Sequence, residues 1–264
     1  MKHILVPIGS SENEKNTLQY AIDFASNIKA KVFVLRAYKV QKKTGTLKNV
    51  DEFLERESNL YMRTIINSVN TKDVTVQLIS ARGNVLDSVT SVDKELNINL
   101  IVTGPKSNSI KEEVFLGSTG GSVLKKTNIP MLIVPDGYTF KPFTSVLTAF
   151  KSGIVKEQSA LNPLQGIVNT FNPKVNLLLV KTPDHTENDL VINEKLEGLK
   201  SNLTISENAT TFQGVLEHFQ SNNPDLLCVF RRSRGFFKKL LEKNTILKKE
   251  FHCSIPLLVL RGKM

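Results

Sequence analysis

This 264-residue chain is poor in cysteine, lacks tryptophan and has no long apolar run, and these absences exclude several classes of protein. Its only cysteines, Cys228 and Cys253, are too few for a disulfide framework and fit a reducing compartment. Its apolar runs reach strand length, far short of the ~20 residues of a membrane-spanning helix. Met1 leads directly into a strand-like segment without the apolar core of a secretory signal. We therefore expect a cytoplasmic protein.

Signatures of catalysis and of metal binding are also missing. The chain has no GxSxG or HExxH motif and no paired carboxylates, so we predict no catalytic residue. Neither His252-Cys253 nor Cys228 has a second pair at ligand spacing, and we predict no metal site. Cys228 and His3 belong to apolar, strand-like runs, where a structural role is expected.

What is present is ample apolar sequence, arranged in a regular alternation. Apolar residues make up 40% of the chain, enough for one large or two ordinary domains. Short apolar runs predict strands near 3–8, 31–37, 74–80, 99–103, 130–134, 144–149, 174–181, 202–206, 225–230 and 256–260. Amphipathic stretches predict helices near 13–28, 49–69, 84–96, 118–126, 155–170, 187–200, 211–221 and 236–251. This alternation indicates an α/β fold in which helices cover both faces of a mainly parallel sheet.

Two of these helices allow more detailed predictions. Asn13 or Ser11 is placed to cap the first helix. The second helix, near 49–69, has an apolar pattern that is expected to face the core, and it runs through Phe53, Leu54, Leu60, Ile65 and Ile66.

The second half of the sequence repeats the first. The matching segments are 128–134 and 254–260, 99–103 and 225–229, 2–6 and 144–148, and 31–36 and 175–180. The first two pairs are displaced by 126 residues. A repeat of this length is a whole domain, so we predict domains at residues 1–137 and 142–264 with a turn-rich linker between them.

Small residues stand where the fourth predicted strand ends and where the next helix begins. Gly104 and Ser107 follow the strand, and nine residues later Gly117, Ser118 and Thr119 open the helix. Small residues admit a phosphate close to the backbone, and the free N–H groups and dipole of a helix start favour an anion. The pattern predicts an anion cradle at the carboxyl end of a parallel strand. It is not a Walker A loop, because no GKS/T lysine follows the glycine.

This glycine pattern, with its surrounding elements, resembles the nucleotide loop of the universal stress protein family. The opening strand, which ends at Pro7 and Ile8, is similar to that family's first strand, and the run 129–134 is similar to its last. The resemblance covers the first half well and the second more faintly. It implies two tandem Rossmann-like domains of the adenine nucleotide alpha hydrolase-like type, each with a five-stranded sheet. It also implies an adenine nucleotide such as ATP, with or without Mg²⁺, and a regulatory stress-response role.

Two residues depart from the family pattern. Ser107 stands where a second glycine is usual, and a serine there costs roughly 1 kcal/mol if its φ must be positive. Gly9 stands where nucleotide-binding members carry an aspartate. The phosphate cradle is therefore nearly whole, whereas the grip on the nucleoside is weakened. The resemblance thus leaves two alternatives open: a structural or interaction scaffold without nucleotide, and a slow ATP hydrolase.

The second half has lost the glycine loop. Phe230 falls on Gly104, Lys243 falls on Gly117, and Lys151 falls opposite Gly9, so we predict no nucleotide site there. A basic run replaces the loop, with eight basic and two acidic residues between 231 and 250 in a chain of net charge +10. It is either a solvated helix face or a side-chain contact with polyanions. Nucleic acid is not expected, because no recognition motif is present.

The two repeats predict a pairing within one chain. The family resemblance puts a dimer seam at the last strand of each domain, which corresponds here to 129–134 and 255–260. We expect these strands to meet inside a single chain, and a homodimer of the whole chain is the alternative left open.

Overall fold

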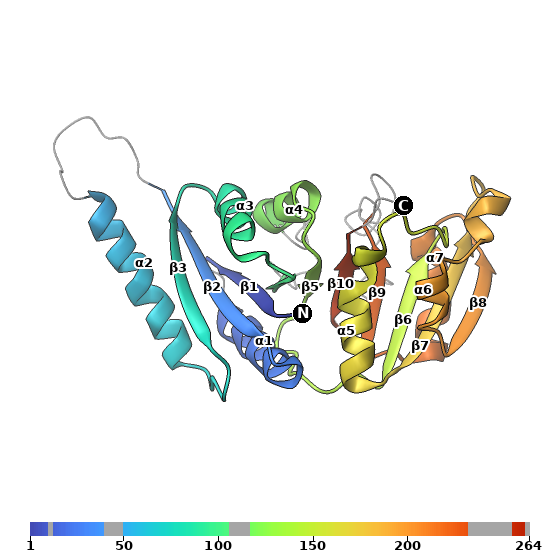
Figure 1. The fold of residues 1–264 in the computed structure, drawn as a ribbon, viewed down its shortest axis with the longest axis horizontal. Coiled ribbons are helices and arrows are strands. Elements are labelled where there is room, and N and C mark those ends of the chain that lie inside the picture. Colours follow the sequence, from blue (N-terminus) through green and yellow to red (C-terminus); the bar gives the residue numbers. More distant parts are fainter. Residues whose placement is uncertain (10–12, 40–49, 106–116, 232–254, 262–264) are drawn as a thin grey trace.

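The computed structural model describes the chain except for residues 10–12, 40–49, 106–116, 232–254 and 262–264. Ten strands form one sheet in the order β3-β2-β1-β4-β5-β10-β9-β6-β7-β8 (Figure 1). Every neighbouring pair is parallel except β5 with β10. The α/β architecture predicted from the sequence is confirmed.

In the first half the elements follow the predicted alternation. They are β1 (His3–Ile8), α1 (Glu14–Ile28), β2 (Lys31–Tyr38), α2 (Val50–Asn67), β3 (Val76–Arg82), α3 (Val85–Leu96), β4 (Leu100–Thr103), α4 (Gly117–Lys126) and β5 (Met131–Ile133). Each lies within about two residues of its predicted range.

The second half departs from the prediction in its helices. Its elements are β6 (Ser145–Phe150), η1 (Gln158–Leu161), α5 (Asn162–Phe171), β7 (Lys174–Lys181), η2 (Glu187–Leu190), α6 (Glu194–Glu197), β8 (Asn202–Glu207), α7 (Thr211–Asn222), β9 (Leu226–Phe230) and β10 (Leu257–Leu260). The helix expected over 187–200 is wrong, because two single turns stand there, separated by an extended Val191. The helix expected over 236–251 lies outside the described residues.

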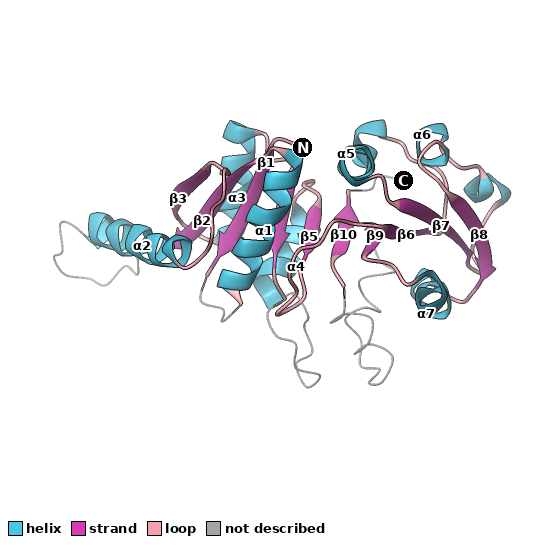
Figure 2. Ribbon diagram, turned by 90° about the horizontal axis from the view of Figure 1, so that it is seen from below, coloured by secondary structure: helices cyan, strands magenta, loops and turns pink. Residues whose placement is uncertain are grey.

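Helices cover both faces of the sheet. One core contains Leu18 of α1, Met62 of α2, Leu164 of α5 and Leu196 of α6. A second core, on the opposite face, is closed by residues of α3, α4 and α7. Figure 2 shows α5 and α6 on one side of the strands and α7 on the other. Both cores run through both halves of the sheet.

The two halves meet where β5 and β10 pair antiparallel. Leu132 lies opposite Leu258, flanked by the pairs Ile133–Leu257 and Met131–Val259. Leu132 and Leu258 are also equivalent positions of the sequence repeat. The strand order therefore reads as the same five-strand pattern twice, mirrored about this pair.

The repeat extends to hydrogen bonds that tie strand starts together. Asn99 Oδ1, just before β4, accepts from the amides of Lys2 and His3 at 2.7 and 3.1 Å. At the equivalent place before β9, Asp225 Oδ2 accepts from the amides of Thr144 and Ser145 at 2.8 and 3.1 Å. The same bond thus recurs with an amide in one half and a carboxylate in the other.

An aromatic cluster also joins the halves. Phe24 of α1 packs on Phe171 of α5, with ring centroids 6.2 Å apart. Phe140 and Phe143, from the segment between β5 and β6, contact both rings. These stacked, tilted and edge-to-face ring contacts add to the stability that the cluster gains from buried apolar area.

Helix α2 corrects the prediction about its inward face. Ser58 and Met62 are the residues it buries, and Ile65 and Ile66 pack partly buried against the core as predicted. Phe53 and Leu60, by contrast, are 62% and 50% exposed. The cause is its position, because α2 packs on β2 and on the edge strand β3 (Figure 1). A helix at the edge of a sheet buries a narrower stripe than its apolar pattern suggests.

The start of α1 corrects a second prediction. Asn13 occupies the N-cap position, but its side chain makes no capping hydrogen bond, and Ser11 lies outside the described residues. An acidic residue in the first turn, Glu14, complements the helix start instead.

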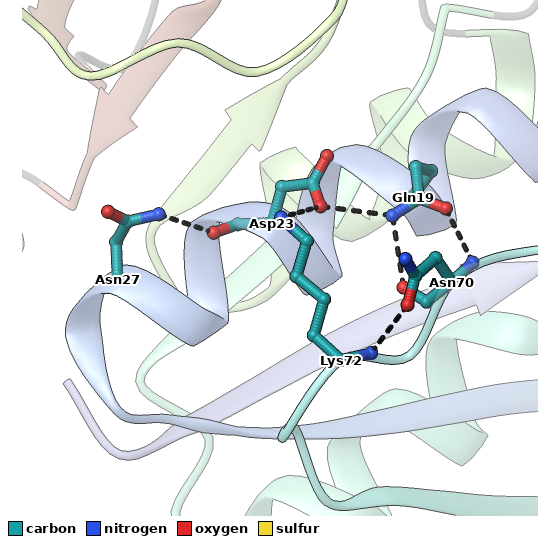
Figure 3. Close-up of polar contacts among 5 residues, drawn as sticks. All are labelled: Gln19, Asp23, Asn27, Asn70 and Lys72. Carbon is teal, nitrogen blue, oxygen red and sulfur yellow. Dashed lines mark hydrogen bonds and ion pairs between the residues drawn. The ribbon is translucent and has the colours of Figure 1, made fainter.

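Farther along, α1 is tied to the turn before β3 by the side chain of Gln19 (Figure 3). Its amide exchanges two hydrogen bonds with the backbone of Asn70. Asp23, one turn on, pairs with Lys72 Nζ at 2.7 Å.

Candidate functional site at the carboxyl edge of the first half

The predicted site lies where helices leave the sheet in opposite directions. β1 and β4 are parallel neighbours, with Ile4 opposite Leu100. The helix after β1 covers one face of the sheet, and the helix after β4 covers the other. In such sheets ligands bind at the carboxyl ends of the two strands on either side of this change.

The structure brings three of the predicted residues to these strand ends. Pro7 and Ile8 close β1, and Ile8 is buried opposite Arg36 of β2. Gly104 follows the last residue of β4. The Cβ of any larger residue at Gly104 would lie 2.6 Å from the Oγ1 of Thr17 in α1. The close approach at this glycine is therefore one between β4 and the helix α1.

Helix α4 begins at Gly117, with Ser118 and Thr119 in its first turn. Because β4 and β5 are parallel, the helix between them runs back across the sheet and starts at the carboxyl edge of β4. Its first N–H groups and the positive end of its dipole belong to that edge. Ser107 and the rest of the segment 106–116 lie outside the described residues.

A carboxylate that the sequence analysis missed stands at the end of β1. Glu14 is only 6% exposed, and its Oε1 accepts from the amide of Gly9 at 2.5 Å. Its Oε2 accepts from the hydroxyl of Tyr61 in α2 at 2.7 Å. The guanidinium of Arg36 stacks on the Tyr61 ring, 3.7 Å from its centroid. The one sequence signal for this contact was an acidic residue in the first helical turn, five positions after Gly9.

These contacts shift the pKa of Tyr61. Its hydrogen bond to Glu14, burial and the charge of that carboxylate together raise the pKa of Tyr61. The phenol is the donor in its hydrogen bond with the carboxylate. Gly9 lacks the side-chain acceptor expected from the resemblance, but Glu14 brings an acceptor to its backbone.

In the second half the equivalent strand ends are filled. Phe230, at the position of Gly104, is buried and packs edge-to-face on Phe150. Lys151, opposite Gly9, pairs with Asp184 at 2.8 Å. The amide of Gly153, just after β6, donates to Asp189 O, and its carbonyl accepts from Asn193 N.

The backbone of Val191 and Ile192 therefore crosses directly over Gly153, where an added Cβ would collide with both residues. This crossing explains the broken helix over 187–200. Lys243 and its neighbours lie outside the described residues.

Only the first residue of the basic run, Arg231, is among the described residues. Its partly exposed guanidinium donates to carbonyl oxygens at the end of α4. The remaining residues of the basic run lie outside the described residues, so both interpretations of the run, a solvated helix face and a contact with polyanions, stay predictions.

Other candidate sites receive no support from the described residues. Among these residues no group of three His, Cys, Asp or Glu side chains is arranged to hold a metal ion. Cys228 is buried within β9, and burial raises the pKa of its thiol. The Nδ1 of His3 contacts Leu96 O at 2.5 Å, a structural contact. His252 and Cys253 are not described, and no described helix is long and apolar enough to cross a membrane.

The sequence and the fold of the chain are similar to those of known proteins. Residues 1–135 match the model of the universal stress protein family. Universal stress protein G of Shigella flexneri is 26% identical over 88 residues, which are 33% of this chain and 61% of that relative. The chain therefore spans less than two thirds of the length of this curated relative.

Solved structures resemble the whole chain. A universal stress protein from Archaeoglobus fulgidus DSM 4304 has a TM-score of 0.72 at 18% identity, covering 98% of this chain and 96% of its own. A protein of unknown function from Pseudomonas aeruginosa PAO1 has a TM-score of 0.59 at 14% identity, covering 99% and 92%. At these identities the likeness establishes a shared fold.

Proposed function

Because the chain belongs to the universal stress protein family, we propose that it is a regulatory stress-response protein that binds one adenine nucleotide in its first half. The observation that carries the proposal is the start of α4. This helix begins with a glycine at the carboxyl edge of β4. It lies beside the pair β1 and β4, whose following helices cover opposite faces of the sheet. N–H groups at a helix start suit phosphate oxygens, and small residues let the phosphates approach.

The contrast between the halves supports a single site. Gly9 and Gly104 contribute no side chains of their own at the first-half strand ends, where Glu14 and Thr17 lie beside them. In the second half, Phe230, the Lys151 pair and the segment over Gly153 occupy the strand ends. The domain division at residues 1–137 and 142–264 belongs to the same proposal. One domain would hold the nucleotide and the other would not.

Glu14 would hold the nucleoside end in place of the absent aspartate. A carboxylate accepts hydrogen bonds from hydroxyl and amide donors, as Glu14 does from Tyr61 and Gly9. A ribose hydroxyl is the matching donor. Glu14→Gln should therefore reduce the preference for ATP over its 2′,3′-dideoxy analogue, and an unchanged preference would remove Glu14 from the site.

Calorimetric titration with ATP, with and without Mg²⁺, tests the main proposal. We expect one site per chain, lost in Gly117→Val because the valine blocks the helix start. Gly121→Val is the matched control, since it places the same side chain one turn later in α4, where a Cβ meets nothing within 4 Å. Absence of binding by the wild type at millimolar ATP would refute the proposal, and two equivalent sites would refute the single-site assignment.

A scaffold without nucleotide is the second candidate, and one observation favours it. The space beside Gly104 is taken by Thr17, so this glycine is explained by packing alone. In that case the wild type and Gly117→Val should have the same, negligible affinity for ATP. Phosphate release in the same samples tests the hydrolase alternative.

A further inference from the structure

Arg231 is a residue of the second half whose side chain ends on the first half. It follows β9, and its Nη1 donates to Leu124 O in α4 at 2.6 Å and also to Thr127 O. Its Nη2 lies 3.4 Å from Asn128 Oδ1. All these acceptors stand at the carboxyl end of α4.

The acceptors are groups that a helix end leaves unpaired. The last carbonyls of an α-helix have no partner within the helix and carry the negative end of its dipole. Thr127 already bonds Val123 O through both its amide and its hydroxyl. Arg231 bonds two further carbonyls, both through the two hydrogens of its Nη1. A cation at this position stabilises the end of α4.

The backbone of Arg231 is itself held. Its amide donates to Leu260 O at 2.9 Å, continuing the pairing of β9 with β10. β10 in turn pairs with β5, the strand that follows α4. The guanidinium is thus fixed relative to α4 through the same strand pair that joins the halves.

The equivalent position of the first half cannot make a reciprocal contact. Pro105 occupies the repeat position equivalent to Arg231, and proline has neither a charged side chain nor an N–H group. The second half therefore acts on the first half's α4 without an equivalent return contact from this position. The half that receives the Arg231 contact is the same half that contains the candidate ligand site.

We propose that Arg231 is a positioning residue through which the second half of the chain holds α4, and with it the Gly117 end of the ligand site, in place. The proposal rests on the proposed nucleotide site for its effect on ligand affinity, but not for its effect on α4. It also gives the degenerate second half a role in the function of the first.

Amide hydrogen exchange and ATP titration of the full chain test this role in Arg231→Met, which keeps the apolar stem and removes the donors. We expect exchange protection in the last turns of α4 to fall about tenfold. We expect the dissociation constant for ATP to rise about fivefold or more. Amides of α1 should be unchanged. Arg231→Lys keeps one charged donor group, so its α4 exchange and ATP affinity should lie between those of the wild type and Arg231→Met. It remains informative if Arg231→Met folds poorly.

Arg261→Met is the matched control. Arg261 follows the neighbouring strand β10, and its Nη2 contacts Ser159 Oγ and Glu157 Oε2 at 2.5 and 2.7 Å, both in the second half. This variant should change neither α4 exchange nor ATP affinity. Unchanged α4 exchange in Arg231→Met would overturn the proposal, as would increased exchange with unchanged ATP affinity. If the wild type binds no ATP, the proposed function fails while the exchange result alone decides whether Arg231 holds α4.

Discussion

At the scale of single residues, Gly104 shows how little room the first half leaves between a strand end and a helix. A methyl group there would lie 2.6 Å from Thr17 Oγ1, and Thr17 is itself buried. We predict that Gly104→Ala lowers the free energy of unfolding by about 1–3 kcal/mol. Adding Thr17→Ala should recover part of that loss, because it removes the contacting hydroxyl.

Urea unfolding of the two single variants and the double variant measures this coupling. Gly121→Ala is the control, since its new methyl meets nothing within 4 Å and should stabilise the helix by about 0.5–1 kcal/mol. Additive losses in the Gly104 and Thr17 pair would show that the two do not compete for space.

Asp225 allows a prediction about pH. Burial raises the pKa of Asp225, but hydrogen bonds from Thr144, Lys141 and Ser145 outweigh burial and hold it below 3.8. A carboxyl whose pKa is lower in the folded protein stabilises it above the unfolded pKa, and this contribution is lost as pH falls through the folded pKa. Asp225→Asn should cost about 1 kcal/mol at pH 7, since Asn99 makes the same two amide bonds in the first half.

The difference between wild type and Asp225→Asn should shrink below about pH 3.8, as followed by urea unfolding at pH 7 and pH 3. Asp184→Asn is the control. Asp184 has a pKa of about 2 through its hydrogen bond to Lys151, but its side chain is 69% exposed. Exposed pairs contribute little, so this variant should cost less than about 0.5 kcal/mol at pH 7. A larger loss of unfolding free energy in Asp184→Asn than in Asp225→Asn would contradict the prediction that Asp225 is the more stabilising carboxylate.

At the scale of elements, several helices end in the left-handed conformation. The terminating residues of α1, α3, α5 and α7 are Lys29, Asn97, Asn172 and Asn223, all with positive φ. Asparagine tolerates this region, whereas lysine has no local hydrogen bond to offset the steric cost. Lys29→Gly should therefore raise the free energy of unfolding by about 0.5–1 kcal/mol. Asn97→Gly should raise the free energy of unfolding by less. Thermal unfolding of the two variants provides the comparison.

Helix α2 allows a second prediction at this scale. Met62 is fully buried, whereas Phe53 on the same helix is 62% exposed. Met62→Ala should lower the free energy of unfolding by about 2–4 kcal/mol through the cavity it leaves. Phe53→Ala should change it by less than about 0.5 kcal/mol, because no core contact is lost. Similar losses from both, measured by denaturant unfolding, would mean that Phe53 is covered in solution.

At the scale of the whole molecule, each half completes the other. Separate residues 1–137 would expose the edge of β5 and leave Phe24 without its partners Phe140 and Phe171. An unpaired apolar edge strand associates with another copy or destabilises the fold. We predict that this fragment forms a dimer or an unstable monomer by light scattering, whereas the full chain is monomeric. A stable, soluble monomer of residues 1–137 would contradict this prediction.

Much of this organisation could be predicted from local sequence patterns. The apolar runs at 3–8 and 99–103 specified buried strands, and the repeat of 99–103 at 225–229 specified an equivalent strand in the second half, since strand formation depends on local pattern. The positions of Pro7, Ile8 and Gly104 at strand ends followed from the same pattern. Gly117 marked the start of α4 for a local reason too, because it directly precedes the amphipathic stretch 118–126.

The sequence by itself therefore determined the alternation of elements, the sheet and the place of the candidate site. Only the tertiary structure decided what surrounds that place. Glu14 reaches Gly9 because α1 folds back onto β1, and Arg231 reaches α4 because β10 lies against β5. The helix over 187–200 breaks because Val191 crosses Gly153. The contacts of Arg231 and Val191 join segments that no local pattern relates, since neighbours across a sheet depend on how the whole chain packs.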